Sequence, residues 1–387
     1  MNQHRVAIGN EALFTRSLRA HVEAARGGAN PPAGILGMEL VRLGLERAAT
    51  AAEAVDVITG LLERHGQWGS GKFGEEAVTG AYENSFLIAD PQEAWIIETL
   101  GREWAARRAD AVDSISNEPS IRTAFDRGSD GLLDKARELG WRGEATLDFA
   151  AAVADPNVPL QVSRIRRARS AELLWRGRSD GGVDLAWVRR ILRDHLEDSF
   201  LGGPYFDAGT PDFHTLCMHE HPSGFTWGNT ASSLIAELPT DPDELDVIWW
   251  SAATPCTTIY LPVFPSAQLP SDLTTPHELP LTSPGRYVQE RFDERSFWWR
   301  TQQALDTARR SGRFPEVQQS LREHLDPIEQ DLEEQVDELR SAWRSDPVAA
   351  TARAGQITQE GLRRVDSATT QAFERLGLER SADPRWA

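Results

Sequence analysis

Lysine is nearly absent from this 387-residue chain, in which only Lys72 and Lys135 occur and all the other basic residues are arginines. Acidic residues outnumber basic ones by 59 to 41, and the net charge is −18. Nucleic acids and anionic membranes are bound through clustered basic residues. The charge therefore argues against both as partners.

Cysteine is also scarce, since Cys217 and Cys256 are the only two. Two cysteines are too few for a disulfide framework and suit a reducing compartment. The chain contains no apolar run approaching the roughly 18 residues of a membrane span, and its N-terminus lacks the apolar core of a signal peptide. We therefore expect a cytoplasmic protein.

The distribution of apolar residues predicts a mixed α+β fold followed by a helical region. We expect the first domain at residues 1–290 and the helical region at residues 291–387. Expected strands lie at residues 5–10, 82–90, 94–99, 214–219, 226–238 and 247–264. Expected helices lie at residues 37–47, 50–66, 131–139, 147–154, 163–175 and 185–196. A proline-rich stretch at residues 262–284 is typical of a linker or an edge loop.

The C-terminal region carries one apolar stripe on an otherwise acidic helix. Its members recur at spacings of three and four residues: Leu325, Ile328, Leu332, Val336, Leu339 and Trp343. Such a stripe needs a partner. A second helix at residues 347–378 supplies one in a helical hairpin within the chain, whereas a homo-oligomer built through these helices is the alternative.

A glycine-rich stretch at residues 66–72 has the spacing of a phosphate-binding loop. However, Phe73 stands where a Ser or Thr hydroxyl should hold magnesium. The stretch also follows a helix, whereas a phosphate-binding loop follows a strand. The sequence therefore does not favour nucleotide binding.

Two cysteines and a group of histidines raise two further alternatives. His214, Cys217, His219 and His221 form a zinc-compatible set, but ligands spaced by two along a strand lie nearly 7 Å apart. The order matches no common zinc spacing, so a metal-dependent hydrolase at these four residues is the weaker alternative. Cys217 or Cys256 as an ordinary catalytic thiol would need a histidine partner, and free cysteines are more often buried.

Several stretches resemble one known family, in order along the chain. Residues 82–99, YENSFLIADPQEAWIIET, are the most specific, and residues 1–14, MNQHRVAIGNEALF, precede them. Asn117 within SNEP and Arg164 within VSRIRRA follow in matching positions. The chain is similar to the secernin-type dipeptidases, a branch of the N-terminal-nucleophile hydrolases.

This resemblance implies two stacked β-sheets between helical layers, αββα, and hydrolysis of a small peptide substrate without a cofactor. In the family an N-terminal cysteine attacks the amide and forms an acyl-enzyme. By position in the motifs, Asn10 would donate to the oxyanion. Asn117 would orient the substrate or the amino group of the nucleophile, and Arg164 would stabilise the charge of the site.

The chain departs from the family at its beginning, because it starts at Met1 and Asn2 rather than at a cysteine. The family's Asn-x-Asp-Arg signature and its first strands have no counterpart either. We therefore expect that the chain as written does not hydrolyse dipeptides. Either the true start lies upstream, or the protein is an inactive relative that acts in binding or assembly.

Overall fold

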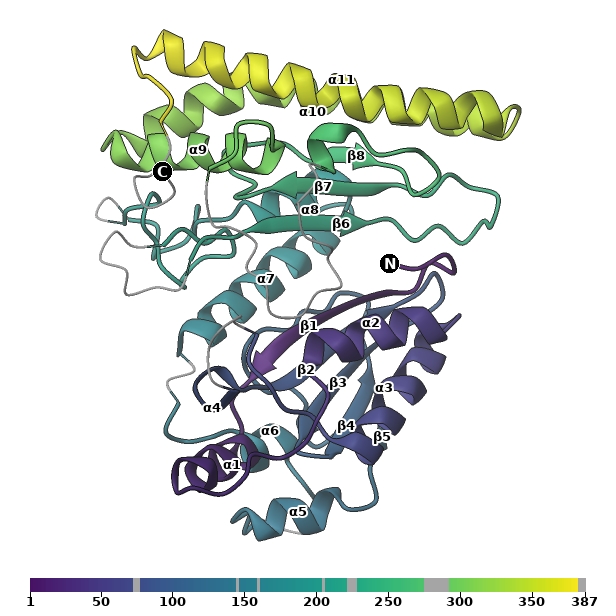
Figure 1. Cartoon of the computed structure of the whole chain (residues 1–387), viewed down its shortest axis with the longest axis vertical. Coiled ribbons are helices and arrows are strands. Elements are labelled where there is room, and N and C mark those ends of the chain that lie inside the picture. Colours follow the sequence, from purple (N-terminus) through teal and green to yellow (C-terminus); the bar gives the residue numbers. More distant parts are fainter. Residues whose placement is uncertain are drawn as a thin grey trace. The chain divides into compact units, whose positions relative to one another are not determined.

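The computed structural model describes residues 1–71, 77–143, 146–158, 161–203, 206–220, 228–274 and 292–381 (Figure 1). The chain divides into two compact units, Met1–Arg178 and Ser179–Ala387. The sequence predicts a boundary at residues 290/291. The C-terminal helices instead share a unit with the second β-sheet.

The first unit is built on a five-stranded antiparallel sheet with the order β1-β2-β3-β4-β5. Its strands are β1 (Ala7–Leu13), β2 (Glu83–Ala89), β3 (Ala94–Leu100), β4 (Glu103–Arg108) and β5 (Arg127–Gly128). Its helices are α1 (Arg16–Arg26), α2 (Gly37–Arg47), α3 (Ala51–His65), α4 (Ala77–Gly80), α5 (Leu132–Glu138), α6 (Phe149–Val153) and α7 (Gln161–Ser179).

The β2–β3 hairpin confirms the strands predicted at residues 82–90 and 94–99. Ala89 pairs with Ala94, and the Asp90 N–H donates to the Glu93 carbonyl across the turn. The Asp90 carboxylate accepts from the backbone N–H groups of Gln92 and Glu93. This is the local chemistry by which aspartate favours turns. The hairpin is therefore fixed by residues adjacent in the sequence.

Both faces of this sheet are covered by apolar side chains, because successive side chains of a strand point to opposite faces. Phe86 and Ile88 of β2 lie in a buried cluster with side chains of α2 and α3. Ile96 and Leu100 of β3 belong to a second buried cluster, formed with side chains of α5 and α6. The sheet is thus the middle layer of the first unit.

Helix α3 confirms the helix predicted at residues 50–66 and begins with side-chain contacts of the capping-box kind. The Thr50 hydroxyl accepts from the Glu53 N–H at 3.1 Å, and the Glu53 carboxylate accepts from the Ala49 N–H at 2.8 Å. Gly66 ends the helix with φ 73°, a conformation that glycine adopts without strain.

The second unit combines a three-stranded antiparallel sheet, β6-β7-β8, with long helices (Figure 1). Its strands are β6 (Ser232–Ala236), β7 (Ile248–Ala252) and β8 (Leu261–Val263). Its helical segments are α8 (Leu185–Leu192), η1 (Ser271–Leu273), α9 (Phe297–Arg310), α10 (Phe314–Trp343) and α11 (Pro347–Arg375). The mixed α+β class predicted from the sequence is confirmed.

Helices α10 and α11 form the intrachain hairpin that the apolar stripe predicted. Leu325, Leu332 and Val336 are fully buried in the core of the unit, where α11 residues such as Ile357 and Val365 also lie. Among the described residues, no helix is both long and apolar enough to cross a membrane.

Two strand predictions in the second unit are wrong, and a third is too long. Residues 214–217 form bends, and one isolated bridge joins Asp212 to His219. The stretch predicted as a single strand at residues 247–264 is β7, a loop at residues 253–260, and β8. Ala253 has φ 52° at the start of this loop, which breaks the extended conformation. Of the strand predicted at residues 226–238 only residues 232–236 pair, and residues 226–227 lie outside the described part.

Gly37, the first residue of α2, tests the packing of this helix against the sheet. A Cβ atom at this position would collide with the carboxamide of Asn84, which is fully buried. We expect Gly37→Ala to lower the free energy of unfolding by about 1–3 kcal/mol, as overpacking does. Gly60→Ala in α3 is the matched control, because its Cβ meets nothing within 4 Å. It should raise stability by roughly 0.5–1 kcal/mol. Urea denaturation of both variants measures the difference, and equal effects would contradict this packing.

Glu83 makes the stability of the first unit dependent on pH. Burial raises the pKa of this carboxyl from 4.5 to about 7, although Thr15 and the Gly101 N–H donate hydrogen bonds to it. Between these two values the folded state holds a proton that the unfolded chain has released. The stabilisation that this proton provides is therefore complete below pH 4.5 and is lost as pH rises to about 7. The free energy of unfolding falls by roughly 3 kcal/mol over this range.

We expect Glu83→Gln to remove this part of the pH dependence, because an amide does not titrate. The measurement is the free energy of unfolding of both proteins at several pH values from 4 to 8. A constant difference between the two proteins over this range would show that Glu83 keeps its ordinary pKa.

Candidate functional site

The residues predicted to be catalytic lie in the first unit, but Asn10 does not join the other two. Its Nδ2 donates to Asn84 Oδ1 at 2.9 Å, and Asn84 Nδ2 donates to Gln67 Oε1 at 2.7 Å. Gln67 Nε2 continues this series of amides to the Gly101 carbonyl. Asn10 shares its side of β1 with Ile8, which packs in the cluster with α2 and α3. The structure thus places Asn10 within a chain of hydrogen-bonded amides on that face.

Asn117 lies against the opposite side of the same strand. Its Nδ2 donates to Glu11 Oε2 at 2.9 Å and to the Ala12 carbonyl at 3.1 Å, while its Oδ1 accepts from Arg166 at 2.6 Å. Burial raises the pKa of Glu11, and the neighbouring Arg166 and Asn117 offset this effect only in part. Asn117 is therefore held rigidly between β1 and α7.

Arg164 lines a pocket of about 590 Å³ in the first unit. Its Nε donates to Glu118 at 3.1 Å, and Arg167 donates to the other oxygen of Glu118 at 3.3 Å. The Glu118 side chain is only 8% exposed, whereas that of Arg164 is 64% exposed. The lining residues are Glu118, Pro119, Ser120, Arg122, Ala150, Ala151, Ala154, Arg164 and Arg167. Three arginines thus share the pocket wall with one carboxylate, so its charge suits an anionic group.

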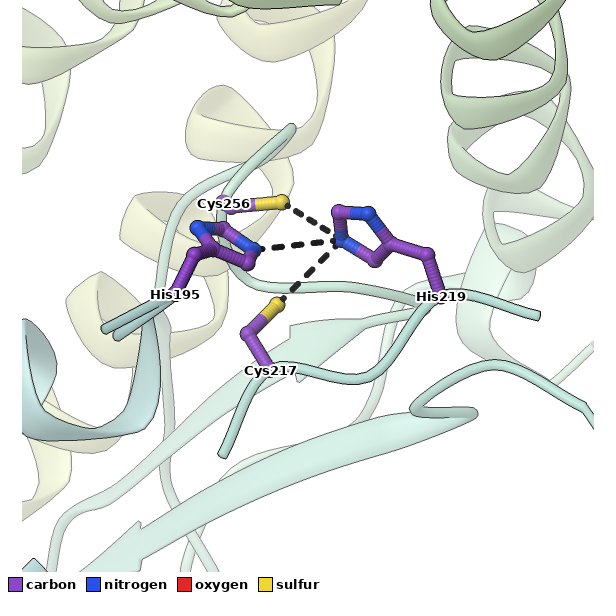
Figure 2. A group of neighbouring side chains, drawn as sticks. All are labelled: His195, Cys217, His219 and Cys256. Carbon is purple, nitrogen blue, oxygen red and sulfur yellow. Dashed lines mark hydrogen bonds between the residues drawn. The ribbon is translucent and has the colours of Figure 1, made fainter. Parts of the chain in front are cut away.

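A second group of functional side chains lies in the interior of the second unit (Figure 2). His195, Cys217, His219 and Cys256 are all at most 2% exposed. Their ligand atoms lie within 4.8 Å of one another. His219 Nε2 is 3.4 Å from His195 Nε2, 3.6 Å from Cys217 Sγ and 3.2 Å from Cys256 Sγ. Four groups able to bind a metal therefore converge on one point.

The two cysteines of this cluster differ electrostatically. Burial raises the pKa of the Cys217 thiol well above its ordinary value, and the neighbouring Cys256 raises it further. Burial would also raise the pKa of Cys256, but contacts with Cys217, His219 and His195 outweigh burial and hold it well below its ordinary value. The thiolate, which is the form that binds metals, is therefore favoured at Cys256.

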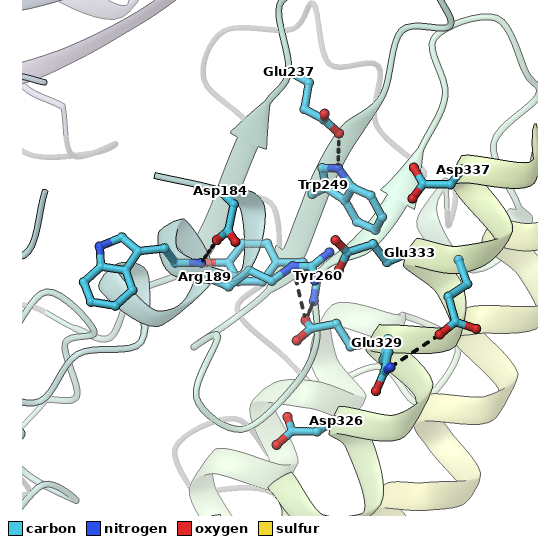
Figure 3. Close-up of polar contacts among 12 residues, drawn as sticks. Asp184, Arg189, Glu237, Trp249, Tyr260, Asp326, Glu329, Glu333 and Asp337 are labelled. Atoms are coloured by element: carbon cyan, nitrogen blue, oxygen red, sulfur yellow. Dashed lines mark hydrogen bonds and ion pairs between the residues drawn. The ribbon is translucent and has the colours of Figure 1, made fainter. Parts of the chain in front are cut away.

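The segments that carry these four residues are tied together by hydrogen bonds. Arg193 donates to the Pro255 carbonyl at 2.9 Å, and the Cys217 N–H donates to the Asp194 carbonyl at 3.2 Å. Arg193 also pairs with Glu329 of α10 at 2.7 Å. Figure 3 shows Glu329 among the polar groups between α10 and the sheet, near Tyr260. The loops are therefore held by contacts independent of any bound ion.

The cluster corrects the ligand set predicted from the sequence. Cys217 and His219 belong to it, because bends at residues 214–217 bring two side chains together that a strand would hold nearly 7 Å apart. His214 is exposed, contacts the Pro211 carbonyl through Nδ1 and lies outside the cluster. His221 lies outside the described residues, as does Lys72 of the glycine-rich stretch.

His195 and Cys256 were missed as ligands. His195 follows α8 at a distance of 22 or more residues from the other members of the cluster, so spacing gives no signal for it. Cys256 was assigned to the interior of a strand, where its side chain would simply pack. The one available signal was that both cysteines of the chain and four of its nine histidines, His195, His214, His219 and His221, fall within residues 195–256.

The two sites differ in what they can do chemically. The pocket beside Arg164 is open to solvent through that side chain and can accept a small anionic molecule. The His/Cys cluster is closed, since its four buried side chains would supply all four ligands of a tetrahedral metal site. A comparison with known protein families found no family model that matches this chain.

Proposed function

We propose that this chain forms the body of an amide-bond hydrolase that acts on small peptides, with the nucleophile supplied by an N-terminal cysteine outside these 387 residues. The observation that supports this proposal is that one predicted residue lines a pocket and a second is the chain neighbour of another lining residue. Arg164 lines the pocket, and Asn117 adjoins Glu118, which lines the pocket and pairs with Arg164. The stacked αββα arrangement implied by the family resemblance is part of this proposal.

The pocket suits the carboxylate of a short peptide. Arg122, Arg164 and Arg167 line it; Glu118 offsets one of these charges, and Asp148, which pairs with Arg122 at 2.5 Å, offsets a second, so one positive charge remains in excess. A guanidinium presents several N–H groups in a plane and matches the two oxygens of a carboxylate. Asn117 is held by Glu11 and Arg166, so its position beside the pocket is fixed before a substrate arrives.

Asn10 has a different position in this proposal. Its amide is engaged by Asn84 on the other face of β1. The oxyanion role of Asn10 stays a prediction from the sequence alone, and Asn117 and Arg164 carry the structural support. The metal-dependent hydrolase is not favoured, because the His/Cys cluster is buried and has a full set of four ligands.

Binding of a dipeptide to the chain itself tests the pocket. We expect Arg164→Ala to weaken binding roughly tenfold or more, because a hydrogen bond to a charged group contributes about 1.5–3 kcal/mol. Arg176→Ala is the control, since Arg176 lies on the same helix and pairs with Glu172 rather than lining the pocket. Isothermal titration calorimetry measures both variants. If the two substitutions weaken binding equally, the pocket is not where the peptide carboxylate binds.

Hydrolysis tests the mechanism. We expect no dipeptide turnover by the 387-residue chain, and turnover by a gene product in which a segment beginning with Cys precedes it. Alkylation of that thiol should abolish the activity. In the active protein Asn10→Ala should lower kcat about 100-fold if it removes one oxyanion donor.

Asn84→Ala is the matched control for Asn10, because it removes the partner of the Asn10 amide and leaves that amide in place. A catalytic Asn10 requires a much larger loss of kcat in Asn10→Ala than in Asn84→Ala. Turnover by the 387-residue chain alone would overturn the assignment of the nucleophile.

A further inference from the structure

We propose that His195, Cys217, His219 and Cys256 bind one zinc ion, which holds together three irregular segments of the second unit. This inference is independent of the proposed hydrolase activity. The four side chains come from the segment after α8, from the loop at residues 212–220 and from the loop between β7 and β8 (Figure 2).

The distances from His219 Nε2 to the other three ligand atoms are close to those of a tetrahedral zinc site. Zinc binds cysteine sulfur at about 2.3 Å and histidine nitrogen at about 2.0–2.1 Å, so tetrahedral angles place two nitrogens about 3.3 Å apart and a nitrogen and a sulfur about 3.6 Å apart. The two Nε2 atoms are 3.4 Å apart. The Cys217 Sγ and Cys256 Sγ atoms lie 3.6 and 3.2 Å from His219 Nε2. All four ligand atoms lie within 4.8 Å of one another, so small side-chain adjustments would bring each of them into contact with one ion among them.

Hydrogen bonds alone cannot satisfy this arrangement. His219 Nε2 has three close neighbours, namely His195 Nε2 and the two sulfur atoms. An imidazole nitrogen carries either one N–H or one lone pair, so it serves one of these neighbours at a time. Buried polar groups without partners are costly. A metal ion at the centre accepts electron pairs from all four atoms at once.

Surrounding contacts support the same assignment. His195 Nδ1 lies 3.2 Å from Glu197 Oε1, which places a carboxylate behind a histidine in the way that commonly orients metal ligands. A two-nitrogen, two-sulfur tetrahedral set selects zinc over calcium or magnesium, which prefer oxygen. All four side chains are buried, so water or substrate does not take a ligand position and the ion is structural.

Metal analysis of the purified 387-residue chain tests this inference. We expect one zinc per chain, retained after dialysis, in the unaltered protein and in His214→Ala, whose histidine lies outside the cluster. His219→Ala and Cys256→Ser should retain less than a tenth of this zinc. They should also unfold about 10 °C lower or more, because bound metal contributes directly to folding.

Two measurements on the unaltered protein keep the inference testable if these variants do not fold. Exchange of the ion for Co²⁺ should give the visible bands of a tetrahedral site together with a thiolate-to-cobalt absorption band. Both cysteines should resist a thiol reagent in the native protein and react, with release of zinc, on denaturation.

Protein without bound metal that takes up neither Zn²⁺ nor Co²⁺ would overturn the inference. A Cys217–Cys256 disulfide in freshly purified protein, or thiols that react at once in the native state, would also overturn it.

Discussion

The ion pair between Arg193 and Glu329 is the interaction on which the organisation of the second unit depends. Glu329 lies in the middle of α10 and is 6% exposed, and its oxygens accept from Arg193 at 2.7 and 2.9 Å. The Tyr260 N–H donates to the same carboxylate at 2.7 Å. Burial would raise the pKa of Glu329, but Arg193, Arg322 and Arg189 outweigh burial and hold it below its ordinary value. A buried charge persists only when it is paired in this way.

This ion pair has a consequence for the proposed zinc site. Arg193 precedes His195 by two residues, and it also donates to the carbonyl of Pro255, the neighbour of Cys256. The segment after α8, the β7–β8 loop and helix α10 are therefore fixed to one another by a single guanidinium. A metal site needs such support, because ligands must be held in place before the ion arrives if affinity is to be high. The Cys217 N–H contact to the Asp194 carbonyl attaches the third segment in the same manner.

The sequence was informative wherever structure is specified by neighbouring residues. The helix predicted at residues 50–66 begins with hydrogen bonds of Thr50 and Glu53, and the strands predicted at residues 82–90 and 94–99 are joined by a turn that Asp90 stabilises. The apolar stripe of α10 packs in the predicted helical hairpin. Each of these signals acts over a few residues. The irregular loops of the second unit carry no such signal. They are shaped by contacts such as the one between Arg193 and Glu329, which joins residues 136 positions apart.

The same reason explains why the candidate sites were predicted only in part. Cys217 and His219 are close in the sequence and were grouped together, whereas His195 and Cys256 reach the cluster through folding of the whole unit. Asn117 and Arg164 were singled out by motif, but only the structure relates them, through Glu118. Asn10 was also singled out by motif, but the structure separates it from Asn117. Asn117 contacts Glu11, and Asn10 and Glu11 are adjacent in β1 and therefore point to opposite faces of the sheet.

The two cysteines of the chain lie close together in the structure, in one buried cluster. A protein with only two cysteines could keep them apart as inert core residues, which is how free cysteines are usually found. Here both side chains meet two histidines in the interior of one unit. A thiolate bound to zinc is stable in a reducing compartment, where a disulfide is not. The proposed metal centre is a cross-link that a reducing environment permits, and it would join loops that the hydrogen bonds of Arg193 and of the Cys217 N–H already hold near one another.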